Sequence, residues 1–325
     1  MIKYLHRFNS QTEKTEFETL ENGRTISSGD TYHEPYVGVV VDEKKPEFNK
    51  PYSIKFRFDD GRIMKNYAIE SALTSSMCSE VYNEHTPAVH AEFGSCFKTT
   101  SRLSYPPYFL DAKFNKGLIN LVGGTFYGNL HTYLTGLTIS NTVENIGNIF
   151  SYHQAGRIKD IYIPASVSSL TYEAFSTSVY TESIKVDPQN PYYTDMGGCN
   201  IVVNKSNMQL LIPCKNSVFP EGIVSIFRET FGKNYAPNVI TFPSTLTSIG
   251  NAFSTLTSYL ANITAIKFLS QTPPSIGQTN SVVFGLDNVI GLYVPDEAVE
   301  TYKQTSPYSN YADKIFPLSE YIETT

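Results

Sequence analysis

The second half of the chain repeats one short pattern, and an internal repeat constrains the fold more strongly than any other feature of a sequence. The clearest copy is Ile-Thr-Phe-Pro-Ser-Thr-Leu-Thr-Ser-Ile-Gly-Asn-Ala-Phe at 240–253, with variants at 137–150 and 161–175. Each copy opens with two apolar residues that flank one other residue, which is the alternation of a β-strand. A proline commonly follows and ends the strand, because its nitrogen cannot donate a hydrogen bond.

The length of one repeat follows from the second apolar residue of each strand. This residue falls at positions 139, 163, 186, 219, 242, 268 and 294, which gives steps of 24, 23, 33, 23, 26 and 26 residues. Five of the six steps lie within the range of leucine-rich repeats. The long step contains two apolar runs, 201–203 and 210–212, around a polar turn at 204–207, which predicts an inserted β-hairpin.

The rest of each repeat carries apolar residues at a spacing of three, as at Val167 and Leu170, and closes with a phenylalanine such as Phe175. This spacing predicts a short 3₁₀ turn or an irregular coil edge. One repeat cannot bury its apolar edge alone, so the strands are expected to stack in parallel with their apolar pairs inward. Phe242 is therefore predicted to lie in the core.

The repeats resemble the BspA-type leucine-rich repeat family over about residues 135–318. The matching residues are Ile163, Pro164, Val167, Leu170, Ala174 and Phe175; Val186, Asp187, Pro188, Asn190, Pro191 and Tyr193; Pro220, Gly222, Ile223 and Ile226; Ile249, Gly250, Ala252 and Phe253; Pro273, Pro274 and Ile276; and Leu292, Val294, Pro295, Ala298, Val299 and Tyr302. That family is associated with cell-surface proteins in adhesion and in host or matrix contact. The resemblance implies a non-enzymatic recognition module that acts outside the cell.

The expected fold is α+β and β-dominated, with two domains. A small β-rich N-terminal module over 1–125, which caps, anchors or oligomerises the chain, precedes a leucine-rich-repeat-like solenoid with parallel strands over 126–325. Residues 103–127 could hold one degenerate first coil. A C-terminal cap is expected from about 295, with a short helix at 296–303 that has Asp296 as its N-cap. Tyr308, Tyr311, Ile315 and Leu318 are expected to cover the last coil.

Charge and hydropathy exclude several classes of partner. The net charge is −6 and no run of five basic residues occurs, so no nucleic-acid partner is expected. No apolar run approaches 18 residues, so no membrane insertion is expected. A homo-oligomer is left open.

No arrangement of residues predicts catalysis, a cofactor or a metal site. His85 and His90 lie near Glu80, Glu84 and Glu92 but lack the spacing of a metal-binding pair. Asp59 and Asp60 could be paired carboxylates, yet a hairpin turn explains them fully. Among the four cysteines, Cys199 and Cys214 flank the predicted hairpin and could form a disulfide, although free thiols are favoured.

The middle residue of each predicted strand should point away from the core and form a column about 30 Å long. Such a face is either the binding surface or a merely solvated one. The candidate binding residues are Thr138, Tyr162, Lys185, Thr241, Lys267 and Tyr293, with Val218 between them. The expected partner is a protein or glycan on a cell surface, or another virion protein.

The N-terminus decides between two interpretations of this recognition protein. Residues 1–9 have neither the apolar core nor the cleavage site of a secretory signal peptide. A structural component of a phage virion, released by lysis and contacting the host surface, needs no such signal and is favoured on this ground. The alternative is a secreted adhesin on a bacterial cell surface that binds host protein or glycan.

Overall fold

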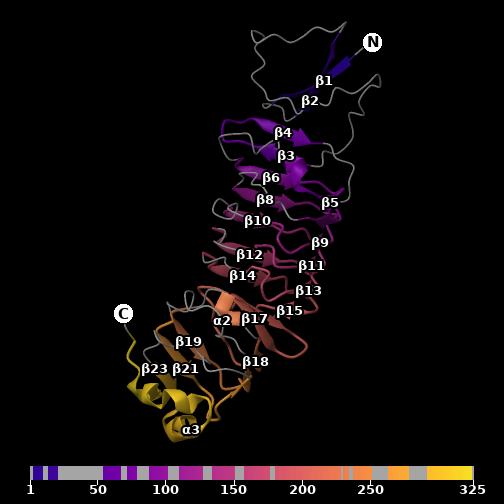
Figure 1. The fold of residues 1–325 in the computed structure, drawn as a ribbon. Coiled ribbons are helices and arrows are strands. Elements are labelled where there is room, and N and C mark those ends of the chain that lie inside the picture. Colours follow the sequence, from indigo (N-terminus) through magenta and orange to yellow (C-terminus); the bar gives the residue numbers. More distant parts are fainter. Residues whose placement is uncertain are drawn as a thin grey trace.

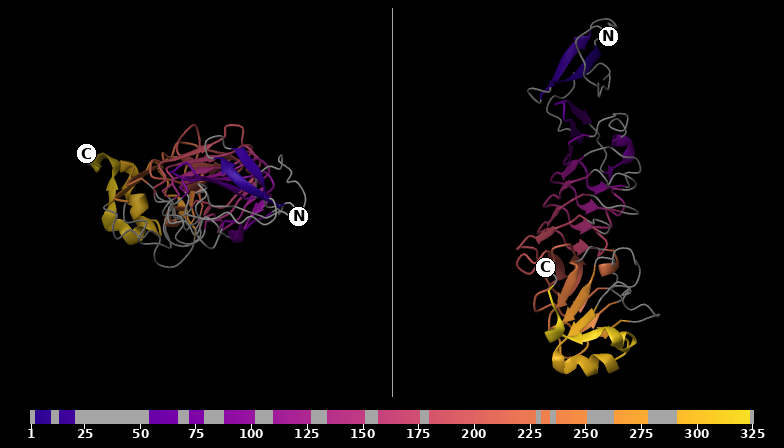
Figure 2. Two further views of the ribbon diagram at one scale, coloured as in Figure 1. Left: turned by 90° about the horizontal axis from the view of Figure 1, so that it is seen from above. Right: turned by 90° about the vertical axis from the view of Figure 1, so that its left-hand side faces the viewer.

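The computed structural model shows an elongated stack of coils (Figure 1). It describes residues 3–9, 14–20, 54–66, 72–78, 88–101, 110–126, 134–150, 157–175, 180–227, 230–233, 237–250, 263–277 and 291–323. The coils follow one another along a single axis, with the N-terminal strands at one end and the C-terminal helices at the other (Figure 2). The predicted β-dominated solenoid with parallel strands is confirmed.

The first strand of each coil forms a row of three- and four-residue strands along one side of the stack. Side chains alternate between the core and the outside along them, as the sequence pattern predicted. Parallel pairing joins β6 to β8 to β10, β12 to β14, and β19 through β21 and β23 to β24. The strands are β6 (His90–Phe93), β8 (Asp111–Phe114), β10 (Gly136–Thr138), β12 (Asp160–Ile163), β14 (Ser183–Val186), β19 (Val239–Phe242), β21 (Ala265–Phe268), β23 (Gly291–Val294) and β24 (Ile315–Pro317).

A second row of very short parallel strands runs along the other side of the stack. These strands explain the apolar spacing of three: a turn follows the first strand, and the later apolar residue enters a two-residue strand rather than a 3₁₀ turn. The row has two parts, because the inserted hairpin interrupts it. The strands are β5 (Ala72–Leu73), β7 (Thr99–Thr100), β9 (Asn120–Leu121), β11 (Asn145–Ile146) and β13 (Ser169–Leu170), then β18 (Ser225–Ile226), β20 (Ser248–Ile249) and β22 (Ser275–Ile276).

The inserted hairpin is confirmed and belongs to the second row. β16 (Ile201–Asn204) pairs antiparallel with β17 (Gln209–Pro213), and β15 (Tyr193–Thr194) pairs with β16. The other edge of β17 pairs in parallel with β18. The insertion therefore extends the sheet between two coils instead of projecting from the solenoid.

The core is a spine of aromatic side chains contributed by successive coils. Phe242 is 1% exposed and its ring centroid lies 5.4 Å from that of Phe268 and 5.8 Å from that of Phe219. In the N-terminal half, the Phe93 and Phe114 centroids are 4.9 Å apart. Burial of such a ring contributes about 1.5–3 kcal/mol, so the stack depends on contacts between neighbouring coils.

Parallel coils begin earlier in the chain than the repeat can be recognised in the sequence. β6 pairs in parallel with β8, and β8 pairs with β10 across the expected boundary at residue 125. N-terminal to β6, β3 (Ile54–Arg57) pairs antiparallel with both β6 and β4 (Ile63–Asn66). β1 (Lys3–Asn9) and β2 (Lys14–Leu20) form a further hairpin. The division into an N-terminal module and a solenoid stays a prediction, and the pairing runs through it.

The C-terminal cap covers the last coil with short helices and one more strand. Tyr302 and Tyr308 are fully buried and β24 pairs in parallel with β23, so the cap continues the first row. The predicted N-cap role of Asp296 was wrong, because Pro295 holds the N-cap position and Asp296 is the first residue of the 3₁₀ turn. The Asp296 carboxylate instead accepts a hydrogen bond from the Ser319 backbone N–H at 3.1 Å. The described helices are η1 (Ser75–Cys78), α2 (Thr230–Lys233), η5 (Asp296–Ala298), α3 (Val299–Gln304), η6 (Tyr308–Lys314) and η7 (Leu318–Glu320).

The two buried tyrosines of the cap predict a loss of stability at alkaline pH. The Tyr302 and Tyr308 hydroxyls donate to the Ser270 and Pro274 carbonyls at 2.9 and 2.8 Å, and burial raises the pKa of both above its usual value near 10. The unfolded chain loses these protons first, so their contribution to stability is complete below pH 10 and falls as pH rises above it.

A variant that lacks both hydroxyl groups tests this pH dependence. Tyr302→Phe with Tyr308→Phe is expected to cost about 1–3 kcal/mol per hydroxyl at pH 7, because each carbonyl loses its partner. The difference in unfolding free energy between wild type and variant, measured by urea denaturation, should then shrink between pH 10 and pH 11.5. A difference in unfolding free energy that stays constant over this pH range would contradict the raised pKa values of Tyr302 and Tyr308.

Candidate functional site

The predicted binding residues lie on the outer side of the first-strand row. Thr138, Tyr162 and Lys185 are exposed, whereas Thr241, Lys267 and Tyr293 are half-buried. Tyr162 is in register with Lys185 across β12 and β14. Thr241, Lys267 and Tyr293 are in register across β19, β21 and β23. The term first-strand face is used below for this surface and its continuation over β6 and β8.

The centre of the first-strand face is exposed. Tyr162 is 48% exposed and its hydroxyl donates to the Asp187 carboxylate at 2.7 Å. This hydrogen bond raises the pKa of Tyr162 and lowers that of Asp187. The ring is thereby held in place while one side of it stays accessible. Lys185 stands beside it and takes part in no ion pair within the described part of the chain.

The C-terminal end of the first-strand face is covered by the protein's own tail. The Lys267 ammonium lies 3.4 Å from the centroid of the Tyr321 ring, a cation–π contact. Tyr293 packs edge-on against Tyr321 at 4.9 Å and beside Phe316 at 5.8 Å. Lys267 and Tyr293 therefore have partners within the chain, and their role as partner-binding residues stays a prediction.

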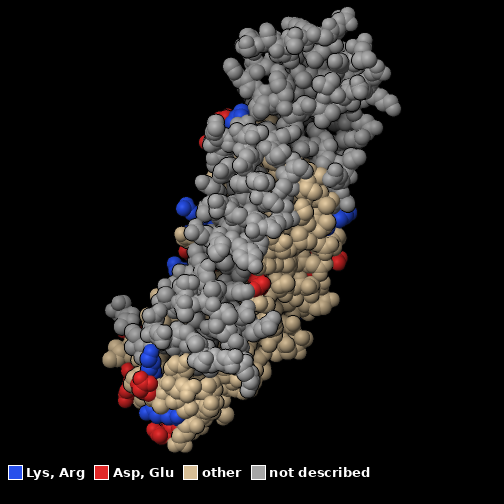
Figure 3. All heavy atoms as spheres, in the orientation of Figure 1, with Lys and Arg blue, Asp and Glu red and all other residues tan. Residues whose placement is uncertain are grey.

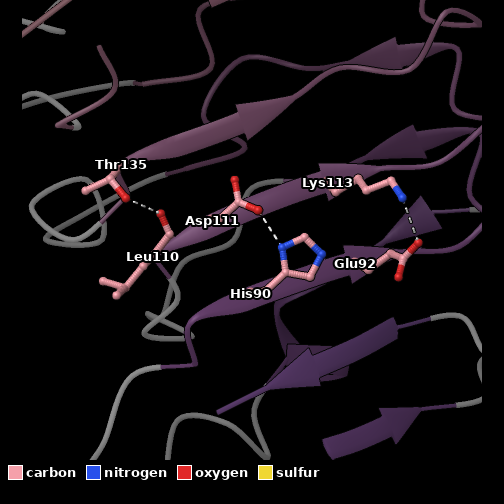
Figure 4. Close-up of polar contacts among 6 residues, drawn as sticks. All are labelled: His90, Glu92, Leu110, Asp111, Lys113 and Thr135. Atoms are coloured by element: carbon pink, nitrogen blue, oxygen red, sulfur yellow. Dashed lines mark hydrogen bonds and ion pairs between the residues drawn. The ribbon is translucent and has the colours of Figure 1, made fainter. Parts of the chain in front are cut away.

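The N-terminal continuation carries polar side-chain pairs that sequence reasoning missed (Figure 4). His90 Nδ1 contacts the Asp111 carboxylate, and Lys113 Nζ lies 3.2 Å from Glu92 Oε1. Asn115 donates a second hydrogen bond to Glu92 at 2.9 Å. Both pairs lie directly across β6 and β8, and the opposite charges of Lys113 and Glu92 stabilise the sheet. The sequence feature that could have revealed these pairs is the alternation of polar and apolar residues in each strand.

Several other predicted features lie elsewhere. Val218 is 59% exposed but lies between strands, so it does not belong to the column. Asp59 and Asp60 form the turn between β3 and β4, where Asp60 accepts a hydrogen bond from the Arg62 backbone N–H at 2.9 Å. His85, Glu80 and Glu84 lie outside the described residues. Among the described ones, no group of three or more His, Cys, Asp or Glu side chains is placed to hold a metal ion.

The two cysteines that flank the hairpin are free thiols, as favoured from the sequence. Burial raises the pKa of the Cys214 thiol, and burial together with the nearby Asp195 carboxylate raises that of Cys199. Both sulfurs donate hydrogen bonds to backbone carbonyls of the hairpin region. These hydrogen bonds and the raised pKa values favour the protonated thiols.

Comparison with known proteins identifies the repeat. The model for the "BspA type Leucine rich repeat region" matches residues 109–195 and 206–281 in six copies, which together make up half of the chain. A comparison with curated proteins finds no match.

Solved structures with distant similarity include a leucine-rich cell surface protein from Faecalibacterium prausnitzii, with 13% identity, coverage of 78% of this chain and 90% of that one, and a TM-score of 0.39. The pneumococcal vaccine antigen PcpA has 14% identity, coverage of 73% and 69%, and a TM-score of 0.44. A leucine-rich repeat protein from Bacteroides ovatus has 13% identity and a TM-score of 0.40; the match spans 64% of this chain and 55% of that one.

The helices described by the structure are all too short or too polar to cross a membrane.

Proposed function

The chain belongs to the BspA-type leucine-rich repeat family, and from this premise we propose that it is a non-enzymatic recognition protein of a bacterial cell surface. The family association with adhesion supports this role. The observation that carries it is the open pair of Tyr162 and Lys185 at the centre of the first-strand face. The proposed partner is a protein of the host or of its extracellular matrix.

The physical character of this pair favours protein recognition. A tyrosine offers a flat apolar ring with a polar tip, and tyrosine is enriched among the residues that dominate binding energy at interfaces. The Asp187 hydrogen bond holds the Tyr162 ring in one orientation, which lowers the entropy lost on binding. The charges of Lys113 and Glu92 on β8 and β6 would add orientation and association rate rather than affinity.

The virion interpretation has weaker support. It rested on the N-terminal residues alone, and neither the family match nor the structures compared above adds to it. The surface-adhesin alternative is therefore the function proposed.

The test is the affinity of the full chain for immobilised fibronectin, laminin and fibrinogen, measured by surface plasmon resonance. For each immobilised protein that binds the wild-type chain, Tyr162→Ala with Lys185→Ala is expected to raise Kd at least tenfold. The reason is that one residue at the centre of an interface commonly contributes about 2 kcal/mol to binding. The control is Tyr192→Ala with Lys116→Ala, which removes an equally exposed tyrosine and a lysine from turns outside the strands. Binding that the control reduces as much as the test variant, or no binding to any of the three, would refute the proposal.

A further inference from the structure

A second surface lies on the opposite row of the solenoid, away from the first-strand face. A depression of about 350 Å³ runs over β7, β9, β11 and β13. It is lined by Thr99, Asn120, Leu121, Val122, Gly123, Asn145, Ile146, Gly147, Ser169 and Thr171. The name second-strand groove is used below for these ten residues.

The second-strand groove has a ladder of neutral polar side chains along it. Thr99, Asn120, Asn145 and Ser169 occupy equivalent positions in four successive strands, in register. Asn145 Nδ2 donates to Asn120 Oδ1 at 2.7 Å. That bond leaves the side-chain atoms Asn120 Nδ2 and Asn145 Oδ1 with no hydrogen bond to another protein group in the described part of the chain. Adjacent strands therefore offer one free donor and one free acceptor.

Gly123 and Gly147 line part of the second-strand groove. A Cβ on Gly147 would lie 2.7 Å from the Gly123 backbone nitrogen, so the close approach of these two coils requires glycine. A Cβ on Gly123 would meet no atom closer than 3.4 Å, and neither glycine adds a side chain to the lining. The neighbouring Ser169 and Thr171 are exposed and add hydroxyl groups.

None of the ten lining residues is acidic or basic. The surface over β9, β11 and β13, on the right in Figure 3, is largely uncharged, with isolated charges at its rim. A phosphate, an acidic polysaccharide or a nucleic acid would find no cation to pair with among these ten residues. The chemistry of the lining therefore matches an uncharged ligand rich in groups that both donate and accept hydrogen bonds.

An extended peptide is a poorer fit than a carbohydrate. Peptides that join sheets use an open strand edge, whereas β9 and β11 are paired on both sides within the row. A vicinal diol instead presents two hydroxyl groups, each able to donate and accept. One can accept from Asn120 Nδ2 while the other donates to Asn145 Oδ1. The rungs repeat at about 4.8 Å, close to the length of one sugar ring in an extended chain.

We propose that the second-strand groove binds a neutral, unbranched glycan, with the Asn120–Asn145 pair holding the diol of one sugar. This site is separate from the first-strand face and does not depend on the function proposed for it. The chain then has two recognition surfaces on opposite sides of one stack, one for protein and one for neutral carbohydrate.

The test uses calorimetric titration of the full chain with the uncharged hexasaccharides of β-1,4-glucose, α-1,4-glucose and β-1,4-mannose, and with hyaluronan as an acidic probe. At least one neutral hexasaccharide is expected to bind and hyaluronan is not. Asn120→Ala with Asn145→Ala should weaken that binding about tenfold, through loss of two hydrogen bonds. Asn216→Ala, an exposed asparagine in a turn outside the groove, is the matched control and should bind as wild type.

A second variant guards against misfolding of the first. Ser169→Tyr places a ring over the groove from an exposed position and leaves the amide ladder intact, so it should abolish glycan binding with an unchanged melting temperature. Failure of all three hexasaccharides to bind, retention of wild-type affinity by the groove variants, or preferential binding of hyaluronan would each overturn the proposal. Binding to matrix proteins, if carried by the first-strand face, should be unaffected by these variants.

Discussion

Phe242→Asp is expected to unfold the C-terminal half of the solenoid as one cooperative unit. The ring is 1% exposed and packs between Phe219, Phe231 and Phe268, with centroid distances of 5.4–5.9 Å. Removal of such a ring alone costs about 3–5 kcal/mol, and a buried unpaired carboxylate adds to this. Since each coil is stabilised only by its neighbours, the loss should spread along the stack.

The effect should appear in thermal melts followed by circular dichroism, with a melting temperature lower by on the order of 10 °C or with loss of the transition. Thr241→Asp is the control, because the adjacent side chain points outward from the same strand. Hydrogen exchange should locate the loss of protection in β19, β21 and β23. A melt unchanged by Phe242→Asp would show that the strand register is incorrect.

Asn190→Ala is the second substitution with a large expected effect. Asn190 is fully buried, and its side-chain amide joins two coils through four hydrogen bonds. Nδ2 donates to the Pro164 and Val167 carbonyls at 2.9 Å each, and Oδ1 accepts from the backbone N–H groups of Tyr192 and Tyr193 at 2.8 Å each. Alanine would leave four backbone groups without these partners, at a cost of about 1–3 kcal/mol for each that water cannot reach.

We expect a loss of at least about 3 kcal/mol in the free energy of unfolding, measured by urea denaturation. Asn190→Asp should recover little of it, because a carboxylate keeps the two acceptor contacts but places a charge beside two carbonyl oxygens. Gln189→Ala, at the exposed neighbouring position, is the control and should change stability by less than about 0.5 kcal/mol. Equal stability of the Asn190 and Gln189 variants would contradict the role given to the amide.

The first-strand row was predictable from the sequence because its residues obey a strict period. Ile161 and Ile163 are buried and Tyr162 is exposed, and the proline that follows marks where the strand ends. The hairpin at 201–213 was predictable for a similar reason: two apolar runs enclose a polar turn. Asn190 stood within the family motif, but its role as a link between coils needs the structure, since its partners lie 23 and 26 positions away.

The second row was not predictable in the same way. A two-residue strand such as Ser169–Leu170 is too short to show an alternation. The early coils were also hidden. In β6 and β8 the inward positions include Ala91 and Ala112, and neither strand is followed by a proline.

The candidate site was likewise predictable only where it depends on the local strand pattern. Outward positions follow from the period of two, so the places of Tyr162 and Lys185 were predicted. The cover that Tyr321 provides over Lys267 could not be, because it depends on how the tail folds back. The second-strand groove depends on the register of four strands and on Gly147, whose need for a bare backbone is visible only once the coils are stacked.

The measurement that tests recognition by the first-strand face most directly is quantitative lysine labelling of the full chain, free and bound to the matrix protein that it captures. Mass spectrometry then reports the reactivity of each lysine. Labelling of Lys185 should fall severalfold in the complex, while that of Lys116, an exposed lysine in a turn outside the strands, should stay constant. Protection of Lys116 with Lys185 still fully reactive would place the partner elsewhere and contradict the assignment of this face.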